Sequence, residues 1–538
     1  MQINNFINKY TIYLVSFFSL ISFGISIFKT IYNPDPIHFS VMFSEANSLL
    51  NKELPYKEIF IIYGLITTII HALSIFFLGK TILSISVITA FIYSCSFLIF
   101  FFILQNFKIN KTISVSILAI IFFIHPGILL PWSNYIAFFF LLLSIFFFSK
   151  NKNIHYFISG LFLGLSVLSR QTFFFSIFLF LVFTFAFENF KSQRKLIIIG
   201  FLTTLLPFFY FLFINNLFNF WIICSFKAHD LSQYSFVHGH LDSNILIIKP
   251  LLSKLIYSLF YFDLKWLFYL CILIFNLINL FNFFFFKKKN DLKQYKIVSI
   301  SFLSVAFYSE AVHIPEIFRL STGSIIGVIP LFFHFKSNFF FKNNFFLFYK
   351  KLFLLIISIV FIFIIFTQYS RINYNILKII NFNSPVYEPK ISLLKHHRFS
   401  KDVSFFYEEF NKEILKMHSL YSVKYNYNFS NNALLPLISN TKSYQISYFH
   451  GFNGLYGRSL WEKAYSYRKD LDLNEKILRK DNDIVLFQII EDKSDFFNFK
   501  FKIYKDNFFI FSELHYPFHN TNKILLILLP NNVNQLKY

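Results

Sequence analysis

Acidic side chains are scarce in the first 370 residues, and they are unevenly distributed. Four of the eleven Asp and Glu residues lie in one segment after the first apolar stretch, namely Asp35, Glu45, Glu53 and Glu58. Asp35 stands between two prolines, and Pro36 disfavours helical geometry at the residue before it. A carboxylate held in a fixed turn at the mouth of a cavity can act as a general base. An ordinary Asx turn or helix cap is the structural alternative.

Arg170 is the basic residue whose surroundings are most unusual. It lies between two short apolar stretches, 157–169 and 172–188, and Gln171 follows it directly. An arginine within a membrane is costly without a partner, and a guanidinium can bind an anion through two parallel hydrogen bonds. We therefore select Arg170 as a candidate binding residue, to which Gln171 adds a hydrogen bond. An arginine that extends to lipid headgroups is the alternative.

A second polar cluster recurs at every third position near residue 310. It consists of Glu310, His313, Glu316 and Arg319. On a helix this spacing produces a polar stripe, although Pro315 is expected to break the helix midway. These side chains are candidates for binding a polar ligand, and a loop with internal ion pairs is the alternative. Two histidines, His38 and His71, are interpreted as structural polar contacts or as ligand contacts.

The composition identifies the setting of these residues. The chain has 538 residues, of which 56% are hydrophobic, 14% charged and 86 Phe. Soluble domains contain about 25% charged residues, and one soluble core could not bury this much apolar surface. A disordered chain, a fibrous protein and a cytosolic enzyme are therefore excluded in favour of a polytopic α-helical membrane protein. The net charge of +23 is assigned to loops between spans rather than to nucleic-acid binding. The three cysteines lie in apolar surroundings and suggest neither a disulfide scaffold nor a zinc site.

About 11–13 transmembrane helices are expected, since a span needs about 20 apolar residues. The candidate segments are 10–28, 59–79, 82–104, 113–130, 134–149, 157–169, 172–188, 196–217, 264–286, 297–313, 319–335 and 352–368, with 251–262 as a shorter addition. Residues 10–28 resemble a signal sequence, but no small-residue cleavage site follows. We therefore expect them to form an uncleaved first span.

The orientation follows from the basic loops, because Lys and Arg concentrate on the cytoplasmic side. If the N-terminus is inside and 59–79 does not cross, the loops around residues 108–111, 150–152, 191–195, 287–296 and 336–351 all lie inside. If 59–79 crosses, at least seven basic residues move outside. We therefore predict that 59–79 is juxtamembrane or re-entrant. The first outer loop (29–81), the 218–250 loop, the 310–319 turn and the C-terminal domain then share the outer face.

Residues 371–538 are more polar than the transmembrane domain 1–370. They contain 23 basic and 16 acidic residues. A helical pattern covers 403–417, and strand patterns cover 483–490 and 523–529. An extracytoplasmic α+β domain is predicted. The segment 448–457 carries three glycines and several aromatic residues, which indicates a tight loop. This loop either is structural or binds a substrate.

The first outer loop also carries a family resemblance. Its elements are Asp35-Pro-Ile-His38, Leu54-Pro-Tyr-Lys-Glu58 and Tyr63-Gly64-Leu65. In this order they resemble the first-loop signature of GT-C membrane glycosyltransferases, in a bacterial branch similar to dolichyl-phosphate-mannose protein mannosyltransferases and Rgt-type sugar transferases. The stretches 130–134 and 160–171 agree, and the similarity covers roughly the first 210 residues. Relatives often carry a second Asp after the histidine, where this chain has Phe39 and Ser40.

The resemblance implies inverting transfer of a sugar from a polyprenyl-phosphate donor to an envelope glycan, lipid or protein, at the outer face of a bacterial inner membrane. Asp35 would be the catalytic base. Substrate-binding residues would be Glu58, His38, Tyr63, Arg170, Gln171, Glu310, His313 and Arg319, without a metal or cofactor. A transporter or flippase of lipid-linked sugars is one alternative, although it should carry ionisable groups at the bilayer midplane. A diverged, non-catalytic envelope protein is the other.

Overall fold

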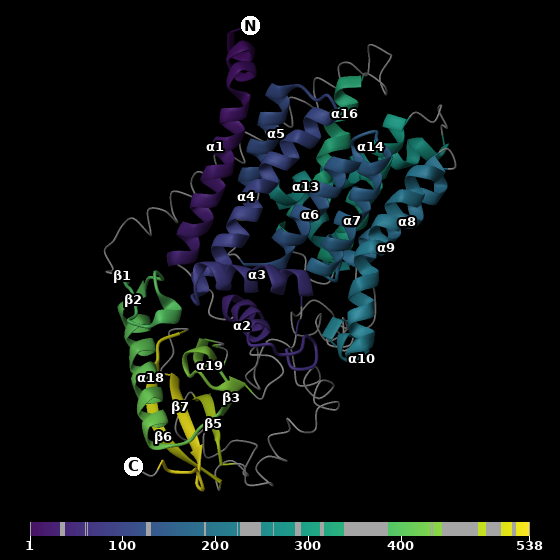
Figure 1. The fold of residues 1–538 in the computed structure, drawn as a ribbon. Coiled ribbons are helices and arrows are strands. Elements are labelled where there is room, and N and C mark those ends of the chain that lie inside the picture. The colour runs from purple at the N-terminus through teal and green to yellow at the C-terminus, as the bar shows by residue number, and fades with distance from the viewer. Residues whose placement is uncertain are drawn as a thin grey trace.

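The structure is a computed structural model, and its description covers part of the chain. The described residues are 2–32, 38–59, 61, 63–124, 131–187, 190–222, 224–225, 249–261, 263–285, 292–312, 317–337, 386–430, 432, 434–443, 482–490, 507–518 and 523–536. They form a large helical bundle with a smaller unit that contains a β-sheet at one end (Figure 1). The predicted span 352–368 and the loop 448–457 lie outside the described residues.

Most of the first 337 residues are helical. The helices are α1 (Gln2–Tyr32), α2 (His38–Leu50), α3 (Leu65–Leu78), α4 (Ile82–Asn106), α5 (Lys111–Ile124), α6 (Ser133–Phe148), α7 (Asn153–Ser169), α8 (Phe173–Phe183), α9 (Lys191–Ile214), α10 (Phe218–Ile222), α12 (Lys249–Tyr261), α13 (Leu264–Phe285), α14 (Leu292–Ala306), α15 (Ile317–Ser321) and α16 (Val328–Ser337). Short 3-10 turns occupy η1 (Thr184–Ala186), η4 (Phe307–Ala311) and η5 (Ser324–Gly327).

Four apolar helices of the described part are long enough to cross a membrane. The segments are Tyr10–Tyr32, Ile82–Asn106, Lys191–Ile214 and Leu264–Phe284. Helices satisfy every backbone hydrogen bond within one segment, which is why apolar runs of this length can enter a bilayer. The helices are thus compatible with membrane integration.

Two of the apolar segments, 59–79 and 319–335, do not form a single straight helix along the bundle. The segment 59–79 contains α3, whose 14 residues extend about 21 Å, and α3 lies across the end of the bundle (Figure 1). The segment 319–335, expected as one span, is instead divided into α15, η5 and α16. At the break, a Cβ added to Gly323 would lie 2.7 Å from the Phe307 ring. The close approach of these two turns therefore interrupts the helix.

Glycines allow α7 and α9 to pack backbone against backbone. A Cβ at Gly160 would lie 2.0 Å from the Ile197 carbonyl oxygen, and one at Gly200 would lie 2.1 Å from the Phe157 carbonyl oxygen. Gly164 faces the Thr204 side chain in the same way, at 2.6 Å. Small residues at a helix contact let the two backbones approach. This contact fixes the end of α7, which carries Arg170.

The end of the bundle opposite α3 collects the basic turns. Lys296 of α14 is buried there, and its Nζ donates to the carbonyls of Ser149 (3.0 Å) and Lys150 (2.8 Å) and to Oδ1 of Asn151 (2.8 Å). These groups follow the C-terminus of α6, where a cation is favoured by the helix dipole. Asn106, which ends α4, donates to Ser149 at the same place (2.7 Å). The turns after α4 and α6 thus meet at one end.

The C-terminal unit is a mixed sheet with helices against it. Its elements are β1 (Val386–Tyr387), η6 (Ser392–Leu394), β2 (Phe399–Ser400), α18 (Lys401–Leu420), β3 (Tyr425–Phe429), α19 (Leu434–Ile438), β4 (Lys442–Ser443), β5 (Ile484–Ile490), β6 (Phe508–Tyr516) and β7 (Lys523–Pro530). The sheet order is β4-β3-β5-β7-β6, with β3 parallel to β4 and β5 and the other pairs antiparallel. The predicted helix and both predicted strands are confirmed as α18, β5 and β7.

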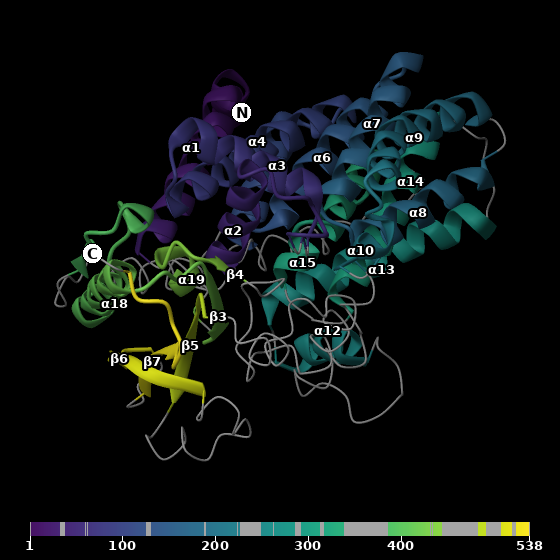
Figure 2. The ribbon, with the colours of Figure 1, turned by 60° about the horizontal axis from the view of Figure 1, so that its bottom comes forward.

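The sheet unit docks onto the bundle through one shared apolar cluster. Figure 2 shows α19 beside α2. The cluster includes Phe39, Met42, Phe43 and Ala46 of α2, Ala72 and Ile75 of α3, and Leu394, Phe406 and Leu435 of the sheet unit. Polar contacts close the end of α1, where the Arg398 amide donates to the Ile31 carbonyl (2.8 Å) and His397 Nδ1 donates to the Thr30 carbonyl (3.1 Å). The sheet unit therefore satisfies the last carbonyls of α1, which a helix cannot pair by itself.

His397 makes this docking sensitive to acid. Burial lowers the pKa of His397 from 6.5 to about 4, the bond to Thr30 and the charge of Glu388 oppose this shift, and the charge of His396 adds to it. Because the folded pKa lies below the unfolded one, the unfolded chain binds a proton first, and stability is lost as pH falls from about 6.5 towards 4. We expect a loss of about 3 kcal/mol at pH 4, measured by unfolding of the purified chain between pH 7 and 4.

Two variants isolate this effect. His397→Gln should flatten the acid dependence, because the amide does not titrate. His515→Gln should leave it unchanged, since His515 is an exposed histidine of β6. The same pH dependence in His397→Gln and in the unaltered chain would contradict the assignment.

The α7–α9 contact predicts which glycine substitutions are tolerated. Gly160→Ala should destabilise the chain by about 1–3 kcal/mol, since the new methyl group overlaps a backbone oxygen. Gly24→Ala is the matched control, because a Cβ there has no neighbour within 4 Å. It should be neutral or stabilising by up to about 1 kcal/mol. Thermal unfolding of both variants in detergent tests this, and equal melting temperatures would count against the packing.

Candidate functional site

Arg170 lies at the turn between α7 and α8. α7 ends at Ser169, and Arg170 itself has an extended backbone (φ −147°, ψ 111°), with its amide bonded to the Ser166 carbonyl. Gln171 and Thr172 complete the turn before α8 begins at Phe173. The Arg170 side chain is only 3% exposed. The end of α7 therefore directs a guanidinium into the protein rather than towards solvent.

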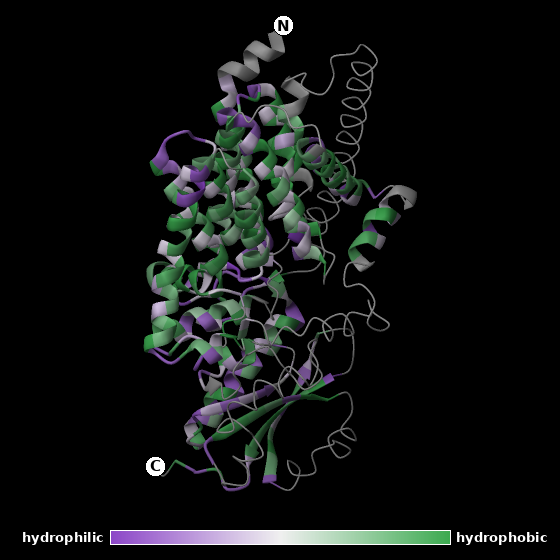
Figure 3. Ribbon diagram, turned by 90° about the vertical axis from the view of Figure 1, so that its right-hand side faces the viewer, coloured by the Kyte–Doolittle hydropathy of each residue, from purple (hydrophilic) through white to green (hydrophobic). Residues whose placement is uncertain are grey.

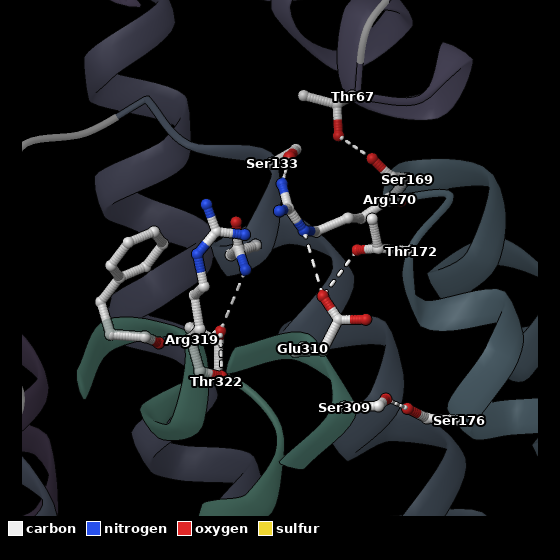
Figure 4. Close-up of polar contacts among 12 residues, drawn as sticks. Thr67, Ser133, Ser169, Arg170, Thr172, Ser176, Ser309, Glu310, Arg319 and Thr322 are labelled. Atoms are coloured by element: carbon white, nitrogen blue, oxygen red, sulfur yellow. Dashed lines mark hydrogen bonds and ion pairs between the residues drawn. The ribbon is translucent and has the colours of Figure 1, made fainter. Parts of the chain in front are cut away.

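The Arg170 guanidinium is held by a buried carboxylate and a hydroxyl (Figure 4). Its Nε lies 3.6 Å from Oε2 of Glu310, which is 2% exposed, and its Nη1 donates to the Ser133 hydroxyl at 3.0 Å. The Thr172 hydroxyl donates to the same Glu310 oxygen at 2.6 Å. A charge buried without a partner is strongly unfavourable. An ion pair between Arg170 and Glu310 thus joins two sites that the sequence analysis selected separately.

Tyr63 and Gly64, which precede α3, pack next to the Arg170–Glu310 pair. The Arg170 guanidinium carbon lies 5.4 Å from the Tyr63 ring centroid, and the Gln171 amide donates to the Tyr63 carbonyl at 3.1 Å. Gly64 has a φ of +152°, and a Cβ there would lie 2.5 Å from the carbonyl oxygens of Leu168 and Ser169. Only glycine allows such an approach at that backbone angle. The Thr67 hydroxyl adds a bond to the Ser169 carbonyl at 2.8 Å.

Arg319 approaches the same region from α15. It is buried, with 5% of its surface exposed, and in Figure 4 its side chain and that of Arg170 point towards a common space. Ring contacts connect the segment before α3 with α15. The Trp132 ring centroid lies 5.6 Å from that of Tyr63 and 5.4 Å from that of Phe318.

Both arginine regions adjoin the first residues of α6. Ser133 contacts Arg170, and the Asn134 side chain donates to the Thr322 hydroxyl (3.3 Å), which itself donates to the Arg319 carbonyl (3.3 Å). The N-terminus of a helix carries a partial positive charge and favours anions. With two guanidiniums and one carboxylate, this end of α6 suits a phosphate or another anion.

The predicted site residues divide into three groups. Tyr63, Arg170, Gln171, Glu310 and Arg319 come together as described. Glu58 does not join them in any described contact, since it is exposed and its Oε2 accepts the Leu54 amide at 2.7 Å to close a turn. Asp35 and His313 lie outside the described residues, as does the side chain of His38, which begins α2.

A further group of buried polar side chains lies near the start of α3, between α2 and α3, and the sequence analysis did not select it as part of the site. Glu45 of α2 is 4% exposed and accepts the Thr68 hydroxyl at 3.3 Å. Burial raises the pKa of Tyr56 above its usual range, the charges of Cys224 and Glu45 raise it further, and the Gln171 side chain lowers it by hydrogen bonding. The Cys224 thiol contacts the Tyr56 carbonyl oxygen at 3.9 Å, and the Gln171 side chain is a hydrogen-bond partner of Tyr56. Glu45 is one of the four acidic residues that cluster after the first apolar stretch, and this clustering is the sequence feature that indicates a role for it.

His71, interpreted from the sequence as a structural contact or a sugar ligand, is fully buried on α3. Its Nε2 lies 3.0 Å from the Thr89 hydroxyl of α4. Among the residues that the structure describes, no group of three or more His, Cys, Asp and Glu residues is placed to hold a metal ion.

The Arg170–Glu310 pair predicts strong coupling in stability. Arg170→Met should cost about 3–5 kcal/mol, because it leaves the Glu310 carboxylate buried without its cation. Adding Glu310→Gln should recover part of that loss, so the double variant should be more stable than the sum of the single variants predicts. Arg194→Met, a half-buried arginine near Phe185, is the control. If the losses of stability in Arg170→Met and Glu310→Gln simply add in the double variant, as measured by thermal unfolding, the pairing is contradicted.

No model of a known protein family matches this chain, and no curated protein matches it either. The function is therefore inferred from the residues and from their arrangement.

Proposed function

We propose that this chain is an integral membrane glycosyltransferase of the GT-C type, which transfers a sugar from a polyprenyl-phosphate donor to an envelope acceptor with inversion at the anomeric carbon. The observation that carries the proposal is the buried Arg170–Glu310 pair at the start of α6, packed against the first-loop segment Tyr63–Gly64. Tyr63–Gly64, the stretch 130–134 at the start of α6 and the stretch 160–171 with Arg170 are among the segments that carry the GT-C resemblance, whereas Glu310 lies outside it.

The distribution of apolar surface supports a membrane location. The exposed faces of α8 and α9 consist of large apolar side chains, among them Phe175, Phe178, Leu206, Tyr210 and Phe213. In Figure 3 apolar residues extend along the helices of the bundle. Exposed apolar surface on this scale marks a contact with lipid or with another protein, and its continuity along these helices favours lipid.

The two ends of the bundle support the proposed orientation. Lys108 follows α4, Lys150 follows α6, and Arg194 lies in the first turn of α9, whereas Arg170 and Glu310 lie at the end where α3 crosses. Basic loops remain in the cytoplasm, so the Arg170 end and the sheet unit would face outward. A short α3 lying across the bundle fits a juxtamembrane segment, as the basic loops predict.

The chemistry assigns a role to each group. An acceptor hydroxyl oxygen attacks C1 of the sugar and gives its proton to the Asp35 carboxylate. The bond between C1 and the phosphate oxygen breaks, and its electron pair leaves with the polyprenyl phosphate. Arg170, Arg319 and the start of α6 stabilise the added charge on that phosphate. Because Glu310 and Ser133 already orient the Arg170 guanidinium, little reorganisation is needed in the transition state.

Asp35→Asn tests the proposed base. The purified chain, in nanodiscs with a panel of undecaprenyl-phosphate hexoses and an envelope extract as acceptor, should form glycosylated product. The variant should lose at least about 100-fold in rate, because the amide cannot accept the proton. Asp402→Asn, on an exposed position of α18, should retain full activity.

Each other outcome has a separate meaning. Full turnover by Asp35→Asn would remove Asp35 from the mechanism. Movement of the lipid-linked sugar across the bilayer without a new glycosidic bond would support a transporter instead. No reaction and no binding with any donor would overturn the glycosyltransferase proposal.

A further inference from the structure

A continuous path of buried contacts connects α2 to Arg170. The Glu45 carboxylate of α2 accepts the Thr68 hydroxyl of α3 at 3.3 Å. The preceding residue, Thr67, donates to the Ser169 carbonyl at 2.8 Å, and Ser169 is directly followed by Arg170. All of these side chains are buried. The first turn of α3 thus lies between the Glu45 carboxylate of α2 and the α7–α8 turn that carries Arg170.

The apolar contacts of α2 do not by themselves determine its position. Phe39, Met42, Phe43 and Ala46 pack into the cluster shared with the sheet unit. Such contacts are non-directional. The bond between Glu45 and Thr68 is directional, so it selects one register of α2 against α3. Gly64 and Thr67 then transmit that register to the α7–α8 turn.

We propose that Glu45 is a positioning residue, which through Thr68 sets α2 against the turn that carries Arg170. The proposal rests on the proposed function for its effect on catalysis. Under that function Arg170 stabilises the leaving phosphate, so the register that Thr67 and Thr68 set affects where its guanidinium lies. A misplacement of about 1 Å at a reacting group can lower a rate about 100-fold.

Substitutions at Thr68 separate positioning from general destabilisation. Thr68→Val keeps the shape and removes the donor, and kcat for sugar transfer should fall about 10- to 100-fold, with KM for the undecaprenyl-phosphate hexose within about twofold. Thr68→Ser restores the hydroxyl and should restore kcat. The pH–rate profile should keep its shape in both variants, because Glu45 does not exchange the proton.

Glu45→Gln separates positioning from catalysis at Glu45 itself. The amide oxygen still accepts the Thr68 hydroxyl, so most of the rate should remain. A loss as large as that of Asp35→Asn would make Glu45 the base and overturn the positioning role. Equal losses of kcat in Thr68→Val and Thr68→Ser would also overturn it.

A distance measurement tests the inference without any activity. Nitroxide labels at Leu50→Cys on α2 and Phe175→Cys on α8, both exposed positions, are introduced after replacement of Cys95, Cys224 and Cys271. Thr68→Val should broaden or shift the distance distribution, and Thr68→Ser should match the parent. An unchanged distribution in Thr68→Val overturns the inference even if sugar transfer is observed. A changed distribution without transfer by the parent chain supports the structural link and leaves the proposed function as the part that fails.

Discussion

Two opposite charges buried at the end of an apolar bundle constrain much of this structure. The Arg170 and Glu310 side chains are 3% and 2% exposed, and burying either charge without the other would be strongly unfavourable. Their pairing requires that the α7–α8 turn and η4 meet, although Thr172 and Glu310 are 138 positions apart in the chain. Ser133 then brings the start of α6 to the same point. The end of the bundle is therefore built around a polar contact, whereas its length is held by apolar packing.

Close backbone approaches make this contact possible. Gly160 and Gly200 let α7 and α9 pack without intervening side chains, and Gly64 lets the first-loop segment rest on the carbonyls that precede Arg170. A Cβ at any of these positions would displace backbone atoms. The directional bonds of Thr67 and Thr68 use the resulting proximity. Backbone contact and side-chain hydrogen bonds thus determine together where the guanidinium lies.

The sheet unit completes the same end of the molecule. Its η6–β2 segment satisfies the last carbonyls of α1, and its apolar residues join those of α2 and α3 in one cluster. α2 is consequently packed between the bundle and the sheet unit. Under the proposed function, this arrangement places the outer domain beside the donor site, where an acceptor must also arrive.

The amino-acid sequence by itself determined the local features of this protein. Apolar runs of the length typical of helices located α4, α6, α7, α9 and α13, short strand-like apolar runs located β5 and β7, and a helix-like stretch located α18. These properties depend on neighbouring residues only. The rarity of charge in the apolar half also singled out Arg170 and Glu310.

Only the tertiary structure decided that these two residues are partners, that Glu58 closes its own turn, and that Glu45 lies against Thr68. It also decided that 319–335 is interrupted where Gly323 meets Phe307. The physical reason is that such contacts join distant positions, and their formation depends on how whole helices pack rather than on the preferences of any short segment.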